Sequence, residues 1–151
     1  MHKTVQNLID IENELKSNLI DINILNLPKI IAVSKTFTID KIYPLIDHGH
    51  LDFGENKVQE AIDKWSRVKI EKPNLKLHMV GKLQSNKVKL AVKLFDYIHS
   101  VDSEKLAKKI LDEQNKINRK IKIFLQVNIG DESQKSGVNK SDVTQLVNYC
   151  K

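Results

Sequence analysis

The sequence predicts an α/β fold in which parallel strands alternate with helices. Two observations support this fold class. Short apolar runs rich in β-branched residues recur after Pro28, and a polar turn and an amphipathic stretch follow each run. Such alternation implies parallel pairing, because each crossover helix returns the chain to the same end of the sheet. The count of units predicts an incomplete TIM-type (β/α) barrel, with about five of the usual eight strand-helix units. A smaller open sheet is the alternative.

An N-terminal helix is expected over residues 4–20, where apolar side chains recur at helical spacing and Thr4 is a candidate N-cap. The helix after the first strand contains Pro44, which should kink it or delay its regular part, and Gly49 should end it. The strands are expected at residues 30–33, 51–53, 75–80, 97–101 and 121–129.

Polar residues mark the starts of three later helices. Asn56, Ser85 and Ser103 follow the second, third and fourth predicted strands, and each is a candidate N-cap. A last helix is expected around residues 141–149. No linker or composition change indicates a second domain.

The amino-acid composition argues against several classes of function. The chain has 151 residues, 40% of them hydrophobic, and a formal net charge of +6. Arginine occurs only at Arg67 and Arg119, so the chain lacks the arginine clusters that typify nucleic-acid surfaces. Cys150 is the single cysteine, which excludes an internal disulfide and a cysteine metal cluster. With no apolar stretch of membrane-spanning length, we expect a soluble cytoplasmic protein without a targeting segment.

Lys35 is the strongest candidate for chemistry. It ends the apolar run at residues 30–34, so a buried strand is expected to deliver its amine to the C-terminal rim, where barrel enzymes place their active sites. Burial against the sheet would lower the pKa of the amine and allow it to form a Schiff base with a carbonyl group. Taken alone, this segment favours the simpler interpretation, a solvated lysine at the end of a strand.

Several further motifs accompany Lys35. They are AVSK at 32–35, DFGEN at 52–56, HMVGKLQSNK at 78–87, IHSVD at 98–102 and LQVN at 125–128. In order and spacing they resemble the YggS-like family of pyridoxal phosphate homeostasis proteins, from about Ile30 to Gly137. The resemblance implies that residues 1–151 form a partial pyridoxal phosphate-binding barrel domain of the alanine racemase N-terminal type. It also implies that Lys35 holds pyridoxal 5'-phosphate as a Schiff base.

Two more residues are candidate cofactor ligands. The resemblance implies that Asn56 approaches the cofactor, whereas an N-cap role would also explain it. His78 could face either the barrel interior or the helices, and a core histidine is the favoured interpretation. Lys135 offers a second amine or, more simply, a solvated loop lysine. No catalytic residue and no metal ligand is predicted.

The resemblance also implies what the chain lacks. The family takes its phosphate-binding groups from the region of the seventh and eighth strands, where barrel phosphate sites commonly lie. We therefore expect a truncated, non-enzymatic cofactor carrier or regulator with impaired binding, which a second chain could complete with the missing strands. The alternatives are a fragment of an amino-acid racemase and a lysine-rich RNA-associated protein, whose binding would weaken steeply with salt.

Overall fold

The centre of the molecule is a five-stranded parallel sheet whose strands follow one another in chain order. The computed structural model describes residues 1–19, 28–130 and 136–151. The strands of the sheet are β1 (Ala32–Val33), β2 (Asp52–Glu55), β3 (Lys76–Met79), β4 (Tyr97–Val101) and β5 (Lys122–Leu125). Each strand pairs in parallel with the next, as in the wall of a (β/α) barrel. The predicted fold class is therefore confirmed, and the wall is incomplete.

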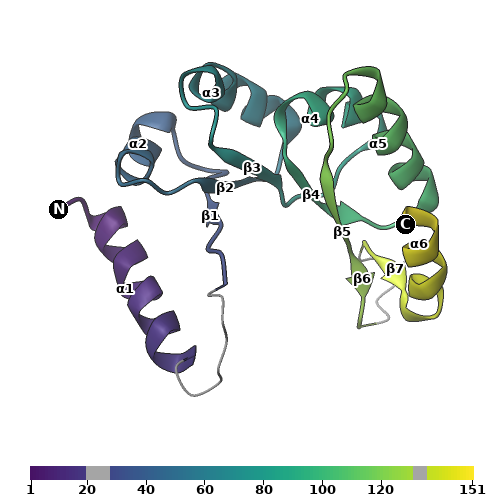
Figure 1. Cartoon of the computed structure of the whole chain (residues 1–151), viewed down its shortest axis with the longest axis horizontal. Coiled ribbons are helices and arrows are strands. Elements are labelled where there is room, and N and C mark those ends of the chain that lie inside the picture. The colour runs from purple at the N-terminus through teal and green to yellow at the C-terminus, as the bar shows by residue number, and fades with distance from the viewer. Residues whose placement is uncertain (20–27, 131–135) are drawn as a thin grey trace.

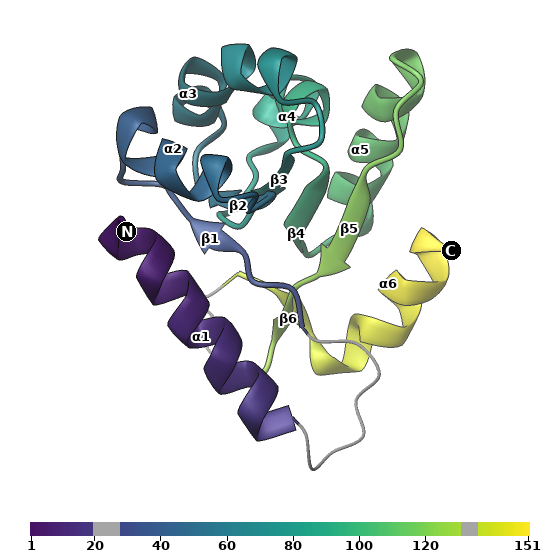
Figure 2. The same cartoon turned by 60° about the vertical axis from the view of Figure 1, so that its left-hand side comes forward.

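Helices cover one face of this sheet. Figures 1 and 2 show α2 (Ile39–Asp47), α3 (Val58–Glu71), α4 (Val88–Leu94) and α5 (Glu104–Lys116) arranged along it. At the two ends, α1 (Lys3–Leu19) lies against α2, and α6 (Val143–Cys150) lies against α5. The 3-10 turns η2 (Ser85–Lys87) and η3 (Lys140–Asp142) precede α4 and α6. Among the described residues, no helix has both the length and the apolar character needed to span a bilayer.

The hydrophobic core lies between the sheet and these helices. Phe53 from β2 and Trp65 from α3 are fully buried there, with ring centroids 5.0 Å apart, and Ile98 from β4 is buried beside them. Burial of side chains of this size stabilises the fold by roughly 1.5–3 kcal/mol each. On the opposite face, which we call the inner face, Val33 and Phe124 are 48% and 51% exposed. The inner face is therefore open to solvent.

The last predicted strand was wrong in its extent. In place of one strand over 121–129, the chain forms β5, breaks at Gln126, and continues as β6 (Val127–Asn128). The Gln126 N–H donates to Val101 O at 2.8 Å, beside a register shift in the β4–β5 pairing. β6 then pairs with β7 (Val138–Asn139), which the sequence did not predict because an isolated Val-Asn pair carries no strand periodicity.

Two predictions concerned α2: an effect of Pro44 on its course and its end at Gly49. The helix runs continuously from Ile39 through Pro44, so the predicted delay was wrong. Pro44 has no backbone N–H, so the helix lacks one hydrogen bond. The carbonyl that would have accepted it lies in the first turn of the helix. At the C-terminus, Gly49 has φ 98°, its N–H donates to Ile46 O, and the next N–H donates to Leu45 O. This Schellman arrangement confirms Gly49 as the residue that ends the helix.

Three of the predicted helix starts can be compared directly with the structure. The Ser103 side chain accepts a hydrogen bond from the Leu106 N–H at 3.3 Å, which confirms it as a cap. Ser85 is not the cap of α4, because it begins η2 instead. Thr4 lies inside the first turn of α1, where its N–H donates to the His2 ring, so that prediction was wrong by two residues.

Candidate functional site

Lys35 directly follows the β1 edge of the sheet. The Ser34 N–H donates to Gly54 O at 2.9 Å, which extends the β1–β2 pairing one residue past the strand and up to Lys35. Lys35 then begins the turn that follows β1, in which the Phe37 N–H donates to Ser34 O at 3.1 Å. The expectation of a buried amine was wrong, because the Lys35 side chain is exposed. The physical reason is that β1 is an edge strand of the described sheet and has a neighbouring strand on one side only.

A buried carboxylate fixes the backbone that carries Lys35. Glu55 at the end of β2 is fully buried, and its Oε1 accepts hydrogen bonds from Ser34 Oγ at 2.7 Å, Lys64 Nζ at 2.9 Å and Trp65 Nε1 at 2.9 Å. The same Lys64 ammonium donates to Ser34 O at 2.8 Å. We call these four residues the Glu55 clamp. Since a buried charge is stable only when it is paired, the clamp ties the peptide before Lys35 to both β2 and α3.

The clamp was not predicted from the sequence. Glu55 belongs to the motif at 52–56, but it was given no role, because its partners lie on two other elements, the end of β1 and α3. One signal was available: a Glu at an apolar strand position, followed by a Lys and a Trp one helical stretch later. Within the described part of the chain, the second carboxylate oxygen of Glu55 is buried and has no hydrogen-bond partner.

Asn56 lies at the same end of the sheet as Lys35. Val33 pairs with Gly54, and Lys35 and Asn56 each come two residues later, where the chain leaves β1 and β2. The N-cap position of α3 belongs to Lys57, without a side-chain capping bond, so the N-cap interpretation of Asn56 was wrong. A Cβ added at Gly81 would lie 2.3 Å from Asn56 O, so only glycine permits this close approach of the two rim loops.

A hollow opens at the rim next to Asn56. Its volume is about 410 Å³. The side chains around it come from the end of β3, the loops after β2 and β3, the start of α3 and η2, and they are Asn56, Lys57, Val58, Gln59, Met79, Lys82, Gln84 and Lys87. One of its three lysines, Lys57, forms an ion pair with Glu60 at 2.6 Å. The hollow therefore combines an amide with ammonium groups at the end of the strands.

His78 is buried, but it lies outside the apolar core between the sheet and the helices. Its Nε2 is 2.9 Å from Asp52 Oδ1, and its Nδ1 is 3.0 Å from His99 Nε2. The Tyr97 ring stacks on it with centroids 4.3 Å apart. Leu77, the preceding residue in β3, is buried in the core, so alternation places His78 on the inner face. Of the two predicted orientations, His78 therefore takes the one towards the barrel interior, where it is buried with both ring nitrogens hydrogen-bonded.

His99 is a further site residue that the sequence analysis did not single out. The pairing of His78 with Tyr97 puts His99 two residues further along β4, towards the C-terminal ends of the strands. Burial lowers the pKa of His99, and the neighbouring His78 ring lowers it further. The sequence does contain one signal for His99: it lies two residues after Tyr97 in a predicted strand, so both rings are expected on the same face of the sheet.

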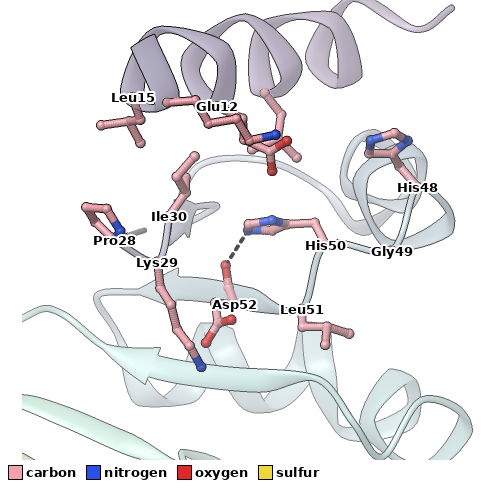
Figure 3. A pocket seen from close by; sticks show the side chains of 12 residues that line it. Glu12, Leu15, Pro28, Lys29, Ile30, His48, Gly49, His50, Leu51 and Asp52 are labelled. Carbon is pink, nitrogen blue, oxygen red and sulfur yellow. Dashed lines mark hydrogen bonds between the residues drawn. The ribbon is translucent and has the colours of Figure 1, made fainter. Parts of the chain in front are cut away.

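A second hollow, of about 480 Å³, lies at the opposite ends of the strands (Figure 3). It is bounded by α1, by residues 28–30 before β1 and by residues 48–52, and the His50 ring there is hydrogen-bonded to Asp52 O at 2.8 Å. Asp52 lines this hollow, whereas Lys35 and Asn56 do not. Lys135, the candidate second amine, lies outside the described residues.

Comparison with known sequences identifies the family. The sequence model of the alanine racemase N-terminal domain matches residues 12–151. The chain belongs to that family. Relatives named pyridoxal phosphate homeostasis protein match it at 42% identity over 110 residues in Buchnera aphidicola and 36% over 118 residues in Escherichia coli K12. These alignments cover 73% and 78% of this chain but 48% and 50% of the relatives, so the chain spans about half of their length.

Several solved structures show the same arrangement. PipY of Synechococcus elongatus with PLP bound is 36% identical, with a TM-score of 0.69 over 87% of this chain and 63% of PipY. A Bifidobacterium adolescentis protein is 25% identical, with a TM-score of 0.83 over 97% of this chain and 62% of that protein. An alanine racemase of Clostridium difficile is 16% identical, with a TM-score of 0.64 over 91% of this chain and 36% of the racemase, which shows the fold alone. The sequence-based resemblance to pyridoxal phosphate homeostasis proteins is confirmed.

Proposed function

We propose that this chain binds pyridoxal 5'-phosphate through Lys35 and takes part in pyridoxal phosphate homeostasis. The observation that carries the proposal is the Glu55 clamp, which fixes the peptide before Lys35 and leaves the amine exposed at the end of the sheet that also carries Asn56. The names of the relatives and the PLP-bound PipY structure support the same ligand.

The residues present fit one end of this cofactor. Pyridoxal phosphate supplies a reactive aldehyde and an electron-withdrawing ring when it is bound. An exposed primary amine on a fixed peptide suits the aldehyde end. The Asn56 amide, which is free of a capping role, can orient the ring substituents. His78 is buried and bonded to Asp52 and His99, so we propose that it supports the site indirectly instead of contacting the cofactor.

We propose that the phosphate end requires further strands. Barrel phosphate sites commonly use the loops after the seventh and eighth strands, whereas this sheet has five strands in the described residues. β1 and β5 are the two edges of that sheet, and Val33 and Phe124 on the inner face are about half exposed. Strands from a second chain, or from further sequence of the same polypeptide, would cover these edges and supply the phosphate contacts.

We propose a carrier or regulatory role in preference to catalysis. The curated relatives carry the name of a homeostasis protein, and the likeness to alanine racemase is at fold level. A racemase needs a second acid-base group across the cofactor ring from the lysine, which is an additional requirement beyond cofactor binding. Binding through Lys35 does not depend on such a group.

Covalent labelling tests the proposal. The chain is incubated with pyridoxal phosphate and reduced with borohydride, and the labelled peptides are mapped by mass spectrometry. We expect label at Lys35, loss of that label in Lys35→Ala, and no change in the control Lys29→Ala, which alters an exposed lysine before β1. Label spread evenly over exposed lysines, and unchanged in Lys35→Ala, would contradict the proposal.

A further inference from the structure

Three titratable side chains form a continuous hydrogen-bonded chain across the inner face. It runs from Asp52 Oδ1 to His78 Nε2 at 2.9 Å, and from His78 Nδ1 to His99 Nε2 at 3.0 Å. The three residues come from the neighbouring strands β2, β3 and β4. Since Asp52 pairs with Lys76 and His78 pairs with Tyr97, each step advances two residues towards the C-terminal ends of the strands.

The chemistry of the groups gives this chain a direction. An ionised carboxylate only accepts hydrogen bonds, so His78 Nε2 must be the donor to Asp52. A neutral imidazole has one donor and one acceptor, so His78 Nδ1 accepts from His99 Nε2–H. His99 Nδ1 then carries the unprotonated lone pair. The lowered pKa of His99, which burial causes first and His78 second, agrees with a neutral ring.

Stacked rings restrict both imidazoles. Tyr97 lies on His78 with an interplanar angle of 6°, and Phe124 lies on His99 with centroids 4.4 Å apart and an angle of 22°. These contacts hinder rotation of the rings out of the hydrogen-bonded geometry. Asp52 sets which nitrogen of His78 donates a hydrogen bond and which accepts one. Because the stacked rings hold both imidazoles in place, His78 sets the same roles for the nitrogens of His99.

We propose that Asp52, His78 and His99 form a polarised relay that holds His99 Nδ1 as a hydrogen-bond acceptor for the molecule bound at Lys35. Each step of the relay moves towards the C-terminal ends of the strands, and Lys35 follows β1 at that end of the sheet, so the relay runs from Asp52 towards the proposed ligand site. Asp52 begins the relay at the hollow that Figure 3 shows, where it lines the cavity with His50. The identity of the ligand rests on the proposed function. The proton positions on the His78 and His99 rings do not depend on it.

Nitrogen-15 NMR of the histidine rings tests the relay without any cofactor. At neutral pH we expect His78 and His99 to carry their proton on Nε2. In Asp52→Asn the side-chain amide can donate as well as accept, so we expect a substantial fraction of both rings to move their proton to Nδ1. The control His50→Gln removes a ring that is hydrogen-bonded to the backbone oxygen of Asp52 and packs edge-on against Phe53, and it should leave both tautomers unchanged.

Labelling of Lys35 supplies the second measurement. With pyridoxal phosphate as the probe, we expect Asp52→Asn to lower its apparent affinity for the chain about three- to tenfold, which corresponds to one lost neutral hydrogen bond. His50→Gln should match the wild type. A proton on His99 Nδ1 in the wild type, unchanged tautomers in Asp52→Asn, or equal affinities in the two variants would each overturn the relay. If wild-type Lys35 takes no label, the proposed function fails, and the NMR result alone then decides the relay.

Discussion

The Glu55 clamp predicts a large loss of stability from a small chemical change. Glu55→Gln keeps the shape of the side chain, and its amide oxygen can still accept from Ser34, Lys64 and Trp65. All three hydrogen bonds lose the negative acceptor, at roughly 1 kcal/mol for each bond. The new amide nitrogen replaces an oxygen that is buried and has no partner in the described structure, so its donors add a further cost.

The expected loss is about 3 kcal/mol of unfolding free energy. This value is at the lower end of the ~3–5 kcal/mol seen when one partner of a buried pair is removed. The lower end applies because the Lys64 side chain is 12% exposed and can recover some hydration, whereas Glu55 has no exposed surface. A small domain has a total stability of about 5–15 kcal/mol, so the effect should be large in proportion.

Urea unfolding provides the assay, with Glu60→Gln as a matched control. Glu60 also pairs with a lysine, but the two side chains are 49% and 65% exposed, so its loss should be about 0.5 kcal/mol or less. Amide exchange at Ser34, whose N–H bonds to Gly54 O, should accelerate in Glu55→Gln and not in the control. A loss in Glu55→Gln no greater than in Glu60→Gln would refute the clamp.

Three further predictions concern the rim, a helix cap and pH. Gly81→Ala should destabilise the chain by roughly 2 kcal/mol or more and displace Asn56, because the new Cβ would meet its backbone at 2.3 Å; urea unfolding and amide exchange measure both effects. Ser103→Ala should cost about 1 kcal/mol of unfolding free energy through loss of its bond to the Leu106 N–H. The lowered pKa of His99 means that the unfolded chain binds more protons as the pH falls through about 6.5, so stability should fall below that pH, and His99→Gln should reduce the slope.

Local rules were sufficient where a few consecutive residues decide the structure. Gly49 ended α2 and Ser103 capped α5 as predicted, because each motif is complete within six residues. The strand at 97–101 has the predicted bounds. β1 has only two residues and is shorter than the predicted strand at 30–33. A central strand gains pairing on both sides, but β1 has a partner on one side only, and periodicity does not report that difference.

The site could be predicted only in part because its contacts depend on strand register. Lys35 and Asn56 were found from their own motifs. The hydrogen bonds of His78 join it to residues 26 and 21 positions away, and each exists only because β3 pairs in one particular register with β2 and β4. A shift of one residue would turn His78 towards the helices and break both bonds.

The two parts of the site depend differently on completion of the barrel. Glu55 and Trp65 are fully buried on the face that α3 covers, so the clamp already has its complete surroundings. His99 is on the inner face and stacks on Phe124, which is 51% exposed. Added strands would therefore exclude water around His99 and strengthen its hydrogen bonds, because electrostatic interactions gain strength in a less polar medium. The position of Lys35, held from the opposite face, should not change.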